Sequence, residues 1–219
     1  GGFVRGRNGI SFQWQARSVD CRGQAFDLSL PLDRPSFATP PEGQAIKTEG
    51  TNMALRRDLL IDLGGFDIAF QFYLDETDLN LRLAAAGAKT AILPLAQVHH
   101  AYAPSPRRTQ NRAVQDLSDV GASSVVFWRK HCPDLPRDSL LLDLRQEQRH
   151  RLLRQRRARQ VSTEQMQQVL HSLESGIAEG AERRFGTNHV FGPTPAPFLP
   201  FRTRANGDHQ VLSGRWWGR

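Results

Sequence analysis

The sequence has little cysteine and no long apolar run, and each shortage excludes a class of protein. Cys21 and Cys132 are the only cysteines, and their wide separation provides neither a disulfide framework nor the spacing of a zinc site. We expect both to be buried thiols. No stretch approaches the roughly 18 continuous apolar residues of a membrane-spanning helix, and the first residues lack the charged-then-apolar order of a signal peptide. These shortages predict a cytoplasmic protein.

Lysine is also scarce, because arginine supplies 26 of the 29 positive charges. The net charge of +7 is placed unevenly: residues 101–219 hold 19 basic against 11 acidic side chains, whereas residues 1–100 hold 10 against 11. The chain of 219 residues, 39% of them hydrophobic, can form one substantial domain with an appendage. The basic character belongs to its second half.

The first hundred residues show patterns of both strands and helices. Short alternations of apolar and polar residues between glycines predict strands and turns over residues 3–30, and the prolines of residues 31–43 predict a loop. Leucines at helical spacing predict a short helix over residues 56–63, ended by two glycines. A second helix is expected from Asp75 to Gly87, followed by a strand over residues 89–93.

The remainder is predicted to be mainly helical. Amphipathic spacing predicts a helix over residues 109–131, and an arginine-dense helix follows over residues 140–160. Ser162 and Gln165 form the capping-box pattern that opens another helix. Repeated prolines after Gly186 predict an extended, poorly ordered tail. We therefore divide the chain into three parts: residues 1–105, a helical, arginine-rich extension over 106–185, and a tail over 186–219.

A series of short motifs occurs in a fixed order between residues 50 and 100: Gly50-Thr51-Asn52, Arg56-Arg57, Gly64-Gly65-Phe66-Asp67, Asp75-Glu76-Thr77-Asp78-Leu79, Arg82, Gly87, Pro94 and His100. This order resembles glycosyltransferase family 2, whose members adopt the GT-A fold. The resemblance covers about residues 47–102 and is weaker over residues 1–46. It implies an α/β fold, with residues 1–105 as the acceptor-side, C-terminal half of a GT-A-like nucleotide-diphospho-sugar transferase domain before the helical tail.

The activity that the resemblance implies is transfer of a sugar, with inversion, from a nucleotide-diphosphate sugar to an acceptor hydroxyl of a glycan, a lipid-linked glycan or a protein. Inversion requires a base that removes the hydroxyl proton, and a carboxylate does this well when a second acid nearby raises its proton affinity. Asp75 and Glu76 form such a pair. The family usually has Asp at the second position, as the base. We favour Glu76 here, while either residue can be the base.

Asp78 and Arg82 lie four residues apart on the same predicted helix face, the spacing of a salt bridge. Such a bridge is mainly structural and orients the acidic start of the helix, and we count both residues on the substrate side of the site. The alternative for the whole acidic group is an ordinary helix N-terminus, where acids are favoured by the helix dipole.

A diphosphate leaving group carries charge that a divalent metal, Mn²⁺ or Mg²⁺, can neutralise. The resemblance places His100 near that metal; the alternative is a hydrogen-bonded histidine at a strand end. Family members hold the nucleotide on an N-terminal half that carries an Asp-x-Asp-like motif, and this chain has no such motif after a βαβ pattern. We therefore expect a fragment without the nucleotide-binding half, with most metal ligands outside this chain.

Three further features lie near the expected site. By resemblance, Gly50-Thr51-Asn52 lines the donor-sugar pocket, and the alternative is a turn before a helix. The turn at Gly64-Gly65-Phe66-Asp67 is predicted to be structural, with Phe66 buried. Trp14 is a candidate for stacking on a sugar ring, although a core tryptophan is the commoner case.

The basic helix has two interpretations. Its arginines form either a solvated face or a contact with anionic lipid at the inner face of the membrane or with a phosphorylated glycan precursor: Arg145, Arg149, Arg151, Arg154, Arg156, Arg157 and Arg159. Nucleic-acid binding lacks the interleaved aromatics that would support it. Two rival functions remain: a non-catalytic binding or scaffold relative of the transferases, and a basic membrane-surface or RNA-associating module.

Overall fold

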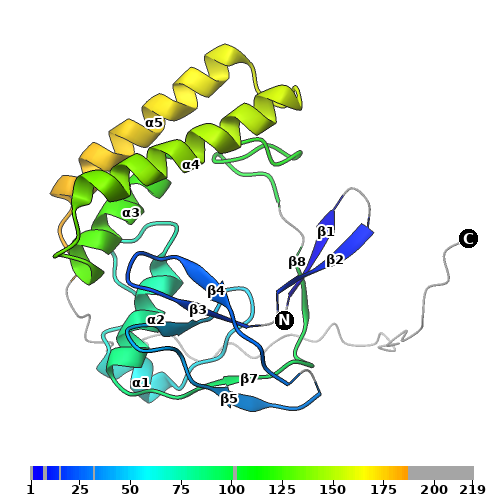
Figure 1. Cartoon of the computed structure of the whole chain (residues 1–219), viewed down its shortest axis with the longest axis vertical. Helices are drawn as coiled ribbons and strands as arrows, with labels where there is room; N and C mark the ends of the chain where they lie inside the picture. The colour runs from blue at the N-terminus through cyan, green and yellow to red at the C-terminus, as the bar shows by residue number, and fades with distance from the viewer. Residues whose placement is uncertain (1, 7–8, 15, 32, 101–102, 187–219) are drawn as a thin grey trace, which may run out of the picture.

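The computed structural model describes residues 2–6, 9–14, 16–31, 33–100 and 103–186, and it shows an α/β arrangement (Figure 1). The described strands are β1 (Gly2–Gly6), β2 (Gly9–Trp14), β3 (Arg17–Val19), β4 (Ala25–Asp27), β5 (Ser36–Ala38), β6 (Ala45–Lys47), β7 (Thr90–Ile92) and β8 (Val98–His100). The described helices are α1 (Arg57–Asp62), α2 (Asp75–Ala85), α3 (Ser118–His131), α4 (Arg137–Arg157) and α5 (Thr163–Glu182). The expected α/β class is confirmed in this coarse form.

The described strands form three small sheets. One has the order β2-β1-β8, another β4-β3-β6, and the third pairs β5 with β7. Only the pairing of β1 with β8 is parallel; the other described ladders are antiparallel. Strands predicted over residues 3–30 and 89–93 are confirmed. The predicted loop over residues 31–43 is wrong at Ser36–Ala38, because a three-residue strand fits between the prolines and pairs with β7.

Helix α2 packs against β6, and this contact forms the small core of the first part. Leu79 and Leu83 of α2 are buried there, as their helical spacing predicted, together with Ala45 and Ile46 of β6. Gly87 ends the segment in a left-handed conformation with φ of 71°. The start of α2, which carries the acidic pair, is thereby held beside the segment that follows β6.

The turn after α1 follows its glycines but leaves its aromatic residue outside. Gly64 and Gly65 adopt φ of 75° and 73°, and their N–H groups donate to the carbonyls of Ile61 and Leu60, the hydrogen-bond pattern of a Schellman turn. Phe66 is 39% exposed, so the expectation that it is buried is wrong. The two glycines reverse the chain without driving the next side chain into the core.

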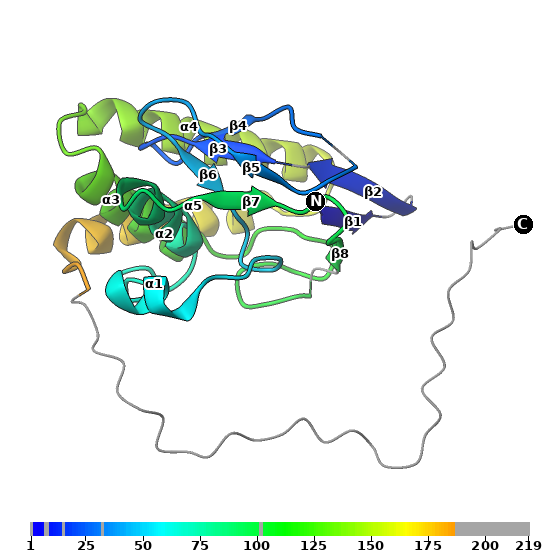
Figure 2. The ribbon, with the colours of Figure 1, turned by 90° about the horizontal axis from the view of Figure 1, so that it is seen from below.

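Helices α3, α4 and α5 form a helical layer on one side of the molecule, seen along its upper edge in Figure 1 and from another direction in Figure 2. Helix α3 packs against α5 at very short range, because Gly121 and Gly176 present no side chain at the crossing. Helix α4 buries a stripe at four-residue spacing: Leu140, Leu144, Gln148 and Leu152. The predicted capping box at Ser162 and Gln165 is confirmed at the start of α5.

Helix α3 starts later than predicted, at Ser118 and not near residue 109. Side chains in the preceding segment bond to the backbone and compete with helix formation. The hydroxyl of Thr109 accepts the N–H of Ala113 at 3.0 Å, and Arg112 adopts a left-handed φ of 66°. Residues 109–117 therefore form turns, and short bridges join Arg108 to Ser105 and to Val114.

The main hydrophobic core joins the helical layer to the segment that precedes α2. Ala69, Phe70 and Leu74 belong to the same buried cluster as Phe127 of α3 and Leu173 of α5. No helix within the described part of the chain has the length and apolar character to cross a membrane. The helical extension thus packs against the segment that precedes α2. Of the tail predicted over residues 186–219, residues 187–219 lie outside the described residues.

Candidate functional site

The acidic pair opens α2 after an unusual backbone turn. Tyr73 and Leu74 adopt left-handed φ values of 73° and 65°, although neither is glycine. Leu74 is the N-cap residue and supplies no side-chain cap. Such positions persist only where the surroundings enforce them, and they concentrate at functional sites. Asp75 and Glu76 follow at once, each half-buried in the first turn.

Glu76 is the carboxyl group whose proton affinity is most clearly altered. Burial, a hydrogen bond with Asp75 and the charges of Asp75 and Glu49 together raise the pKa of Glu76 to about 7, and burial is the largest cause. A carboxyl with this pKa exists in both protonation states near neutral pH, as a general base requires. The sequence predicted the effect of Asp75; the contributions of burial and of Glu49 emerge only in the folded chain.

The segment after β6 is bonded to α2 and brings the charge of Glu49 to bear on Glu76. The ammonium of Lys47 lies 2.5 Å from the carboxylate of Glu49, and the hydroxyl of Thr48 donates to the side-chain oxygen of Asn80 in α2 at 2.7 Å. The amide of Asn52 donates to the carbonyl of Ala96 at 2.9 Å. These bonds fix the turn Gly50-Thr51-Asn52 between α2 and the segment before β8.

All three residues of that turn are exposed. The backbone N–H of Asn52 donates to the carbonyl of Glu49 at 2.9 Å, and its side-chain amide donates to the carbonyl of Ala96. The geometry accommodates both interpretations made from the sequence, a tight turn and a surface for a polar ligand. It places the turn close to the Glu49 end of the acidic group.

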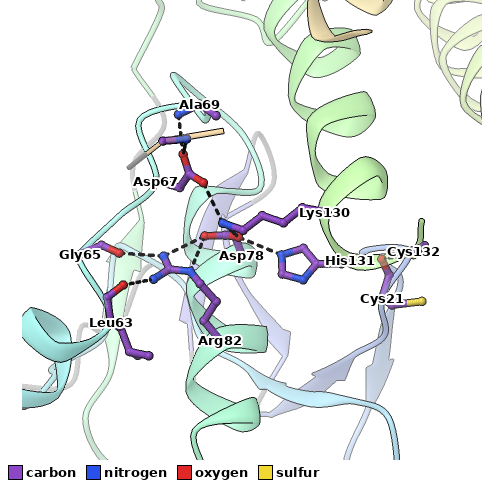
Figure 3. A network of polar contacts seen from close by, with 11 residues as sticks. Cys21, Leu63, Gly65, Asp67, Ala69, Asp78, Arg82, Lys130, His131 and Cys132 are labelled. Atoms are coloured by element: carbon purple, nitrogen blue, oxygen red, sulfur yellow. Dashed lines mark hydrogen bonds and ion pairs between the residues drawn. The ribbon is translucent and has the colours of Figure 1, made fainter. Parts of the chain in front are cut away.

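Asp78 lies in the same first turn of α2 as the acidic pair and is completely buried, with an exposed fraction of 0%. Its carboxylate accepts from the guanidinium of Arg82, the ammonium of Lys130 and the Nε2 of His131, at 2.8, 2.7 and 2.8 Å (Figure 3). Burial alone would raise the pKa of Asp78, but the hydrogen bonds from His131 and Lys130 and the charge of Arg82 hold it below its usual value. The predicted bridge to Arg82 is confirmed, and the ion pairs of Asp78 fix the first turn of α2, which carries the acidic pair.

The same cations hold the glycine turn. Arg82 donates to the carbonyls of Leu63 and Gly65 at 2.9 and 2.7 Å, and Lys130 pairs with Asp67 at 2.7 Å (Figure 3). Helix α2, the glycine turn and the end of α3 are therefore locked into one frame. Lys130 and His131 were not predicted from the sequence as part of this site. The sequence indicated only that both residues lie in the basic last turn of a predicted helix.

Two cysteines far apart in the sequence meet beside this frame. The thiol of Cys132, which follows α3, donates to the carbonyl of Cys21 at 2.5 Å. Burial raises the pKa of the Cys132 thiol, and the neighbouring Cys21 raises it further. The expectation of a buried thiol is confirmed for Cys132, whereas Cys21 is half-buried. Their proximity could not be read from the sequence.

The remaining predicted residues are placed only by their backbone. His100 ends β8 and Trp14 ends β2, and both side chains lie outside the described residues. Within the described ranges, no group of three or more His, Cys, Asp or Glu side chains could hold a metal ion. The expectation of a divalent metal held mostly by ligands outside this chain stays a prediction.

Comparisons with protein-family models, with curated proteins and with solved structures gave no match to this chain. The assignment of a function consequently depends on the residues of the chain and on their geometry.

Proposed function

We propose that the chain is the acceptor-side half of a GT-A-like inverting glycosyltransferase of the family 2 type, acting on a nucleotide-diphosphate sugar as a hexosyltransferase does. The observation that carries the proposal is the environment of Glu76. Glu76 is half-buried, and burial together with the neighbouring Asp75 and Glu49 raises the pKa of its carboxyl to about 7. An ordinary acidic helix start does not need a buried carboxyl with raised proton affinity, whereas general-base catalysis does.

In the proposed reaction the acceptor hydroxyl oxygen attacks the anomeric carbon of the donor while the bond to the diphosphate breaks. The hydroxyl proton passes to the ionised carboxylate of Glu76, and the electron pair of the broken bond leaves with the diphosphate. Asp75 and Glu49 favour the protonated product because their negative charges oppose the ionised form of Glu76. Glu76 then releases the proton to water. Asp75 is the alternative base.

The ion pairs of Asp78 keep the start of α2, and with it the acidic pair, in place. The pairing of Asp78 with Arg82 and Lys130 fixes α2 against the glycine turn, and the bond from Thr48 to Asn80 fixes the segment after β6 against α2. A bound Mn²⁺ or Mg²⁺ would neutralise the charge of the leaving diphosphate. His100 is the one predicted ligand in this chain, so no step of the mechanism depends on a metal held by the described residues.

The test compares wild type with Glu76→Gln and Asp75→Asn, in the full-length natural protein, for nucleoside-diphosphate release from a panel of sugar nucleotides with and without manganese. We expect Glu76→Gln to lower kcat by about 10²- to 10⁴-fold, the usual contribution of a general base. Asp143→Asn on the exposed side of α4 is the matched control and should retain full activity. Unfolding curves must show that each variant is folded.

Two results would contradict the proposal. Full activity in both Glu76→Gln and Asp75→Asn would remove the acidic pair from the chemistry. Failure of every folded form to consume any sugar nucleotide would favour the non-catalytic scaffold.

A further inference from the structure

The turn before the acidic pair places two aromatic rings at the surface. Phe72 and Tyr73 are 42% and 43% exposed, although their neighbours Phe70 and Leu74 are buried. The left-handed backbone at Tyr73 and Leu74 directs the chain this way, and the hydroxyl of Ser123 in α3 holds the turn by donating to the carbonyl of Phe72 at 2.7 Å. The exposed rings are therefore presented by a fixed backbone.

Arginines from two elements surround these rings. The guanidinium of Arg107 lies 4.1 Å from the centre of the Phe72 ring and is neutralised by Asp119 at 2.5 Å. The charged neighbours of the Tyr73 hydroxyl are Glu147 and Arg151, one turn apart on α4. The aromatic turn thus lies against both the segment 103–116 and the arginine-rich helix.

Gln155 brings the two arginine-bearing elements together. Its side-chain oxygen accepts the N–H of Val114 at 3.1 Å, and its amide donates to the carbonyl of Arg112 at 3.2 Å. Arg108 is bridged to Val114, so it lies beside the turn of α4 that carries Arg151. Burial lowers the pKa of Arg151, and the positive charges of Arg108 and Arg154 lower it further. The charges of Glu147 and Tyr73 act in the opposite direction.

Arg151 therefore has two arginines, Arg108 and Arg154, among its charged neighbours, together with Glu147 and Tyr73, whose charges favour its ionised form. Arg151 and Arg154 both retain solvent-exposed surface. Like charges held close together repel one another, and an anion between them would relieve that repulsion. Arginine guanidinium groups suit phosphate oxygens because they donate two parallel hydrogen bonds.

We propose that the acceptor carries a phosphate or diphosphate group, which Arg151 and Arg154 bind beside Arg108 while Tyr73 packs against the adjoining sugar. This inference rests on the proposed function, because it places the acceptor at the Glu76 site. Tyr73 and Glu76 are three residues apart, so their Cα atoms lie within about 11 Å of one another. A short glycan can span from the arginines to the base.

The test measures acceptor kinetics in the full-length protein with matched pairs of substrates: alkyl glycosides, the corresponding glycosyl 1-phosphates, and polyprenyl-diphosphate-linked glycans in neutral detergent. The variant is Arg151→Gln/Arg154→Gln. The control is Arg149→Gln/Arg156→Gln, which removes the same charge from exposed positions elsewhere on α4. Hydrolysis of the donor without acceptor is measured in parallel, because it reports the proposed function alone.

We expect the first variant to raise KM for phosphate-bearing acceptors at least tenfold while KM for neutral glycosides and donor hydrolysis stay unchanged. The control should behave as wild type, and Arg151→Lys/Arg154→Lys should recover part of the loss. Equal use of soluble and lipid-linked phosphates by wild type would show that the phosphate itself is recognised. A preference for the lipid-linked acceptor that is lost in Arg151→Gln/Arg154→Gln, but not in the control, would identify a lipid-linked diphosphate as the ligand.

Three outcomes would overturn the inference. Wild type that uses neutral and phosphorylated acceptors equally would remove the need for an anion site. An equal loss in the two arginine variants would indicate general attraction to charge and not a defined site. Absence of donor consumption by every form would overturn the proposed function and this inference together. If donor hydrolysis is intact and either of the two results above is found, the inference alone is overturned.

Discussion

The carboxylate of Asp78 accepts a hydrogen bond from Nε2 of His131 at 2.8 Å, which joins the helix of the acidic pair to the end of α3 across 53 residues of sequence. Lys130 contacts the same carboxylate oxygen at 2.7 Å. A fully buried carboxylate is stable only when its charge is matched in this way. The proposed base is therefore held by an ionic frame that the first hundred residues cannot form alone.

Replacing Asp78 by Asn tests that frame. The amide keeps the shape but removes the negative charge, which leaves Lys130 and Arg82 partly uncompensated in the interior. We expect the free energy of unfolding to fall by about 3 to 5 kcal/mol, as is usual when one partner of a buried ion pair is removed. Urea unfolding followed by circular dichroism measures the change.

The matched control is Asp143→Asn, because Asp143 lies on the exposed side of α4. Its unfolding free energy should stay within about 0.5 kcal/mol of wild type. If Asp78→Asn were as stable as this control, the ionic frame would not be needed for folding.

The raised pKa of Glu76 makes the free energy of unfolding depend on pH in the opposite direction from that expected for an ion-paired carboxylate. Its pKa is about 7 in the folded chain and 4.5 in the reference state, so the folded protein binds more protons between these values. Stability present below pH 4.5 is therefore lost as the pH rises towards 7. The whole shift corresponds to about 3 kcal/mol, and partial contact with solvent reduces the expected effect to about 1 to 2 kcal/mol.

Glu76→Gln should consequently stabilise the protein at pH 8 by about 1 to 2 kcal/mol and have little effect at pH 4.5. Urea midpoints of wild type and variant at the two pH values give the comparison. Glu182→Gln, at the exposed end of α5, should show no such difference. A variant that is equally stable relative to wild type at both pH values would show that Glu76 ionises without cost in the folded chain.

The elements predicted best from the sequence are those determined by local chemistry. Leucines at helical spacing and two glycines defined the short helix α1, and a capping box marked the start of α5. The pair Asp75 and Glu76 was identified as the candidate base from its place in the order of motifs that resembles glycosyltransferase family 2, and adjacent acids raise each other's proton affinity. These features need only neighbours in the sequence.

The features that the sequence did not reveal depend on tertiary contacts. Lys130 became part of the site only because α3 ends beside Asp78, and Cys21 meets Cys132 for the same reason. Residues 109–117 carry a helical pattern, but side-chain hydrogen bonds and a left-handed Arg112 override it. GT-A architecture, donor and metal remain predictions, since nothing in the described structure tests them.

The crossing of α3 and α5 predicts intolerance to even one added methyl group. A Cβ atom at Gly176 would overlap the backbone carbonyl of Ser118, and backbone atoms cannot move aside as a flexible side chain can. We expect Gly176→Ala to lower the unfolding free energy by about 2 to 3 kcal/mol, despite the better helix propensity of alanine. Ser175→Ala, on the exposed side of the same helix, should cost less than about 0.5 kcal/mol. Equal stability of the two variants would mean that the helices are not this close in solution.

The strained turn before the acidic pair gives a prediction that separates backbone from side chain. Tyr73→Ala and Tyr73→Gly remove the same ring, so they differ only in how well each residue tolerates φ of 73°. A residue with a Cβ pays about 1 to 2 kcal/mol in this conformation, while glycine loses about 0.5 to 1 kcal/mol of chain entropy on folding. We expect the glycine variant to be the more stable by up to about 1 kcal/mol, as measured by urea unfolding.

At Gln146, which lies within α4 and is exposed, the order should reverse, because alanine is favoured over glycine by about 1 kcal/mol in a helix. Should alanine be the more stable residue at both positions, the turn would relax in solution, and Phe72 and Tyr73 would not be held beside the arginines as the proposed acceptor site requires.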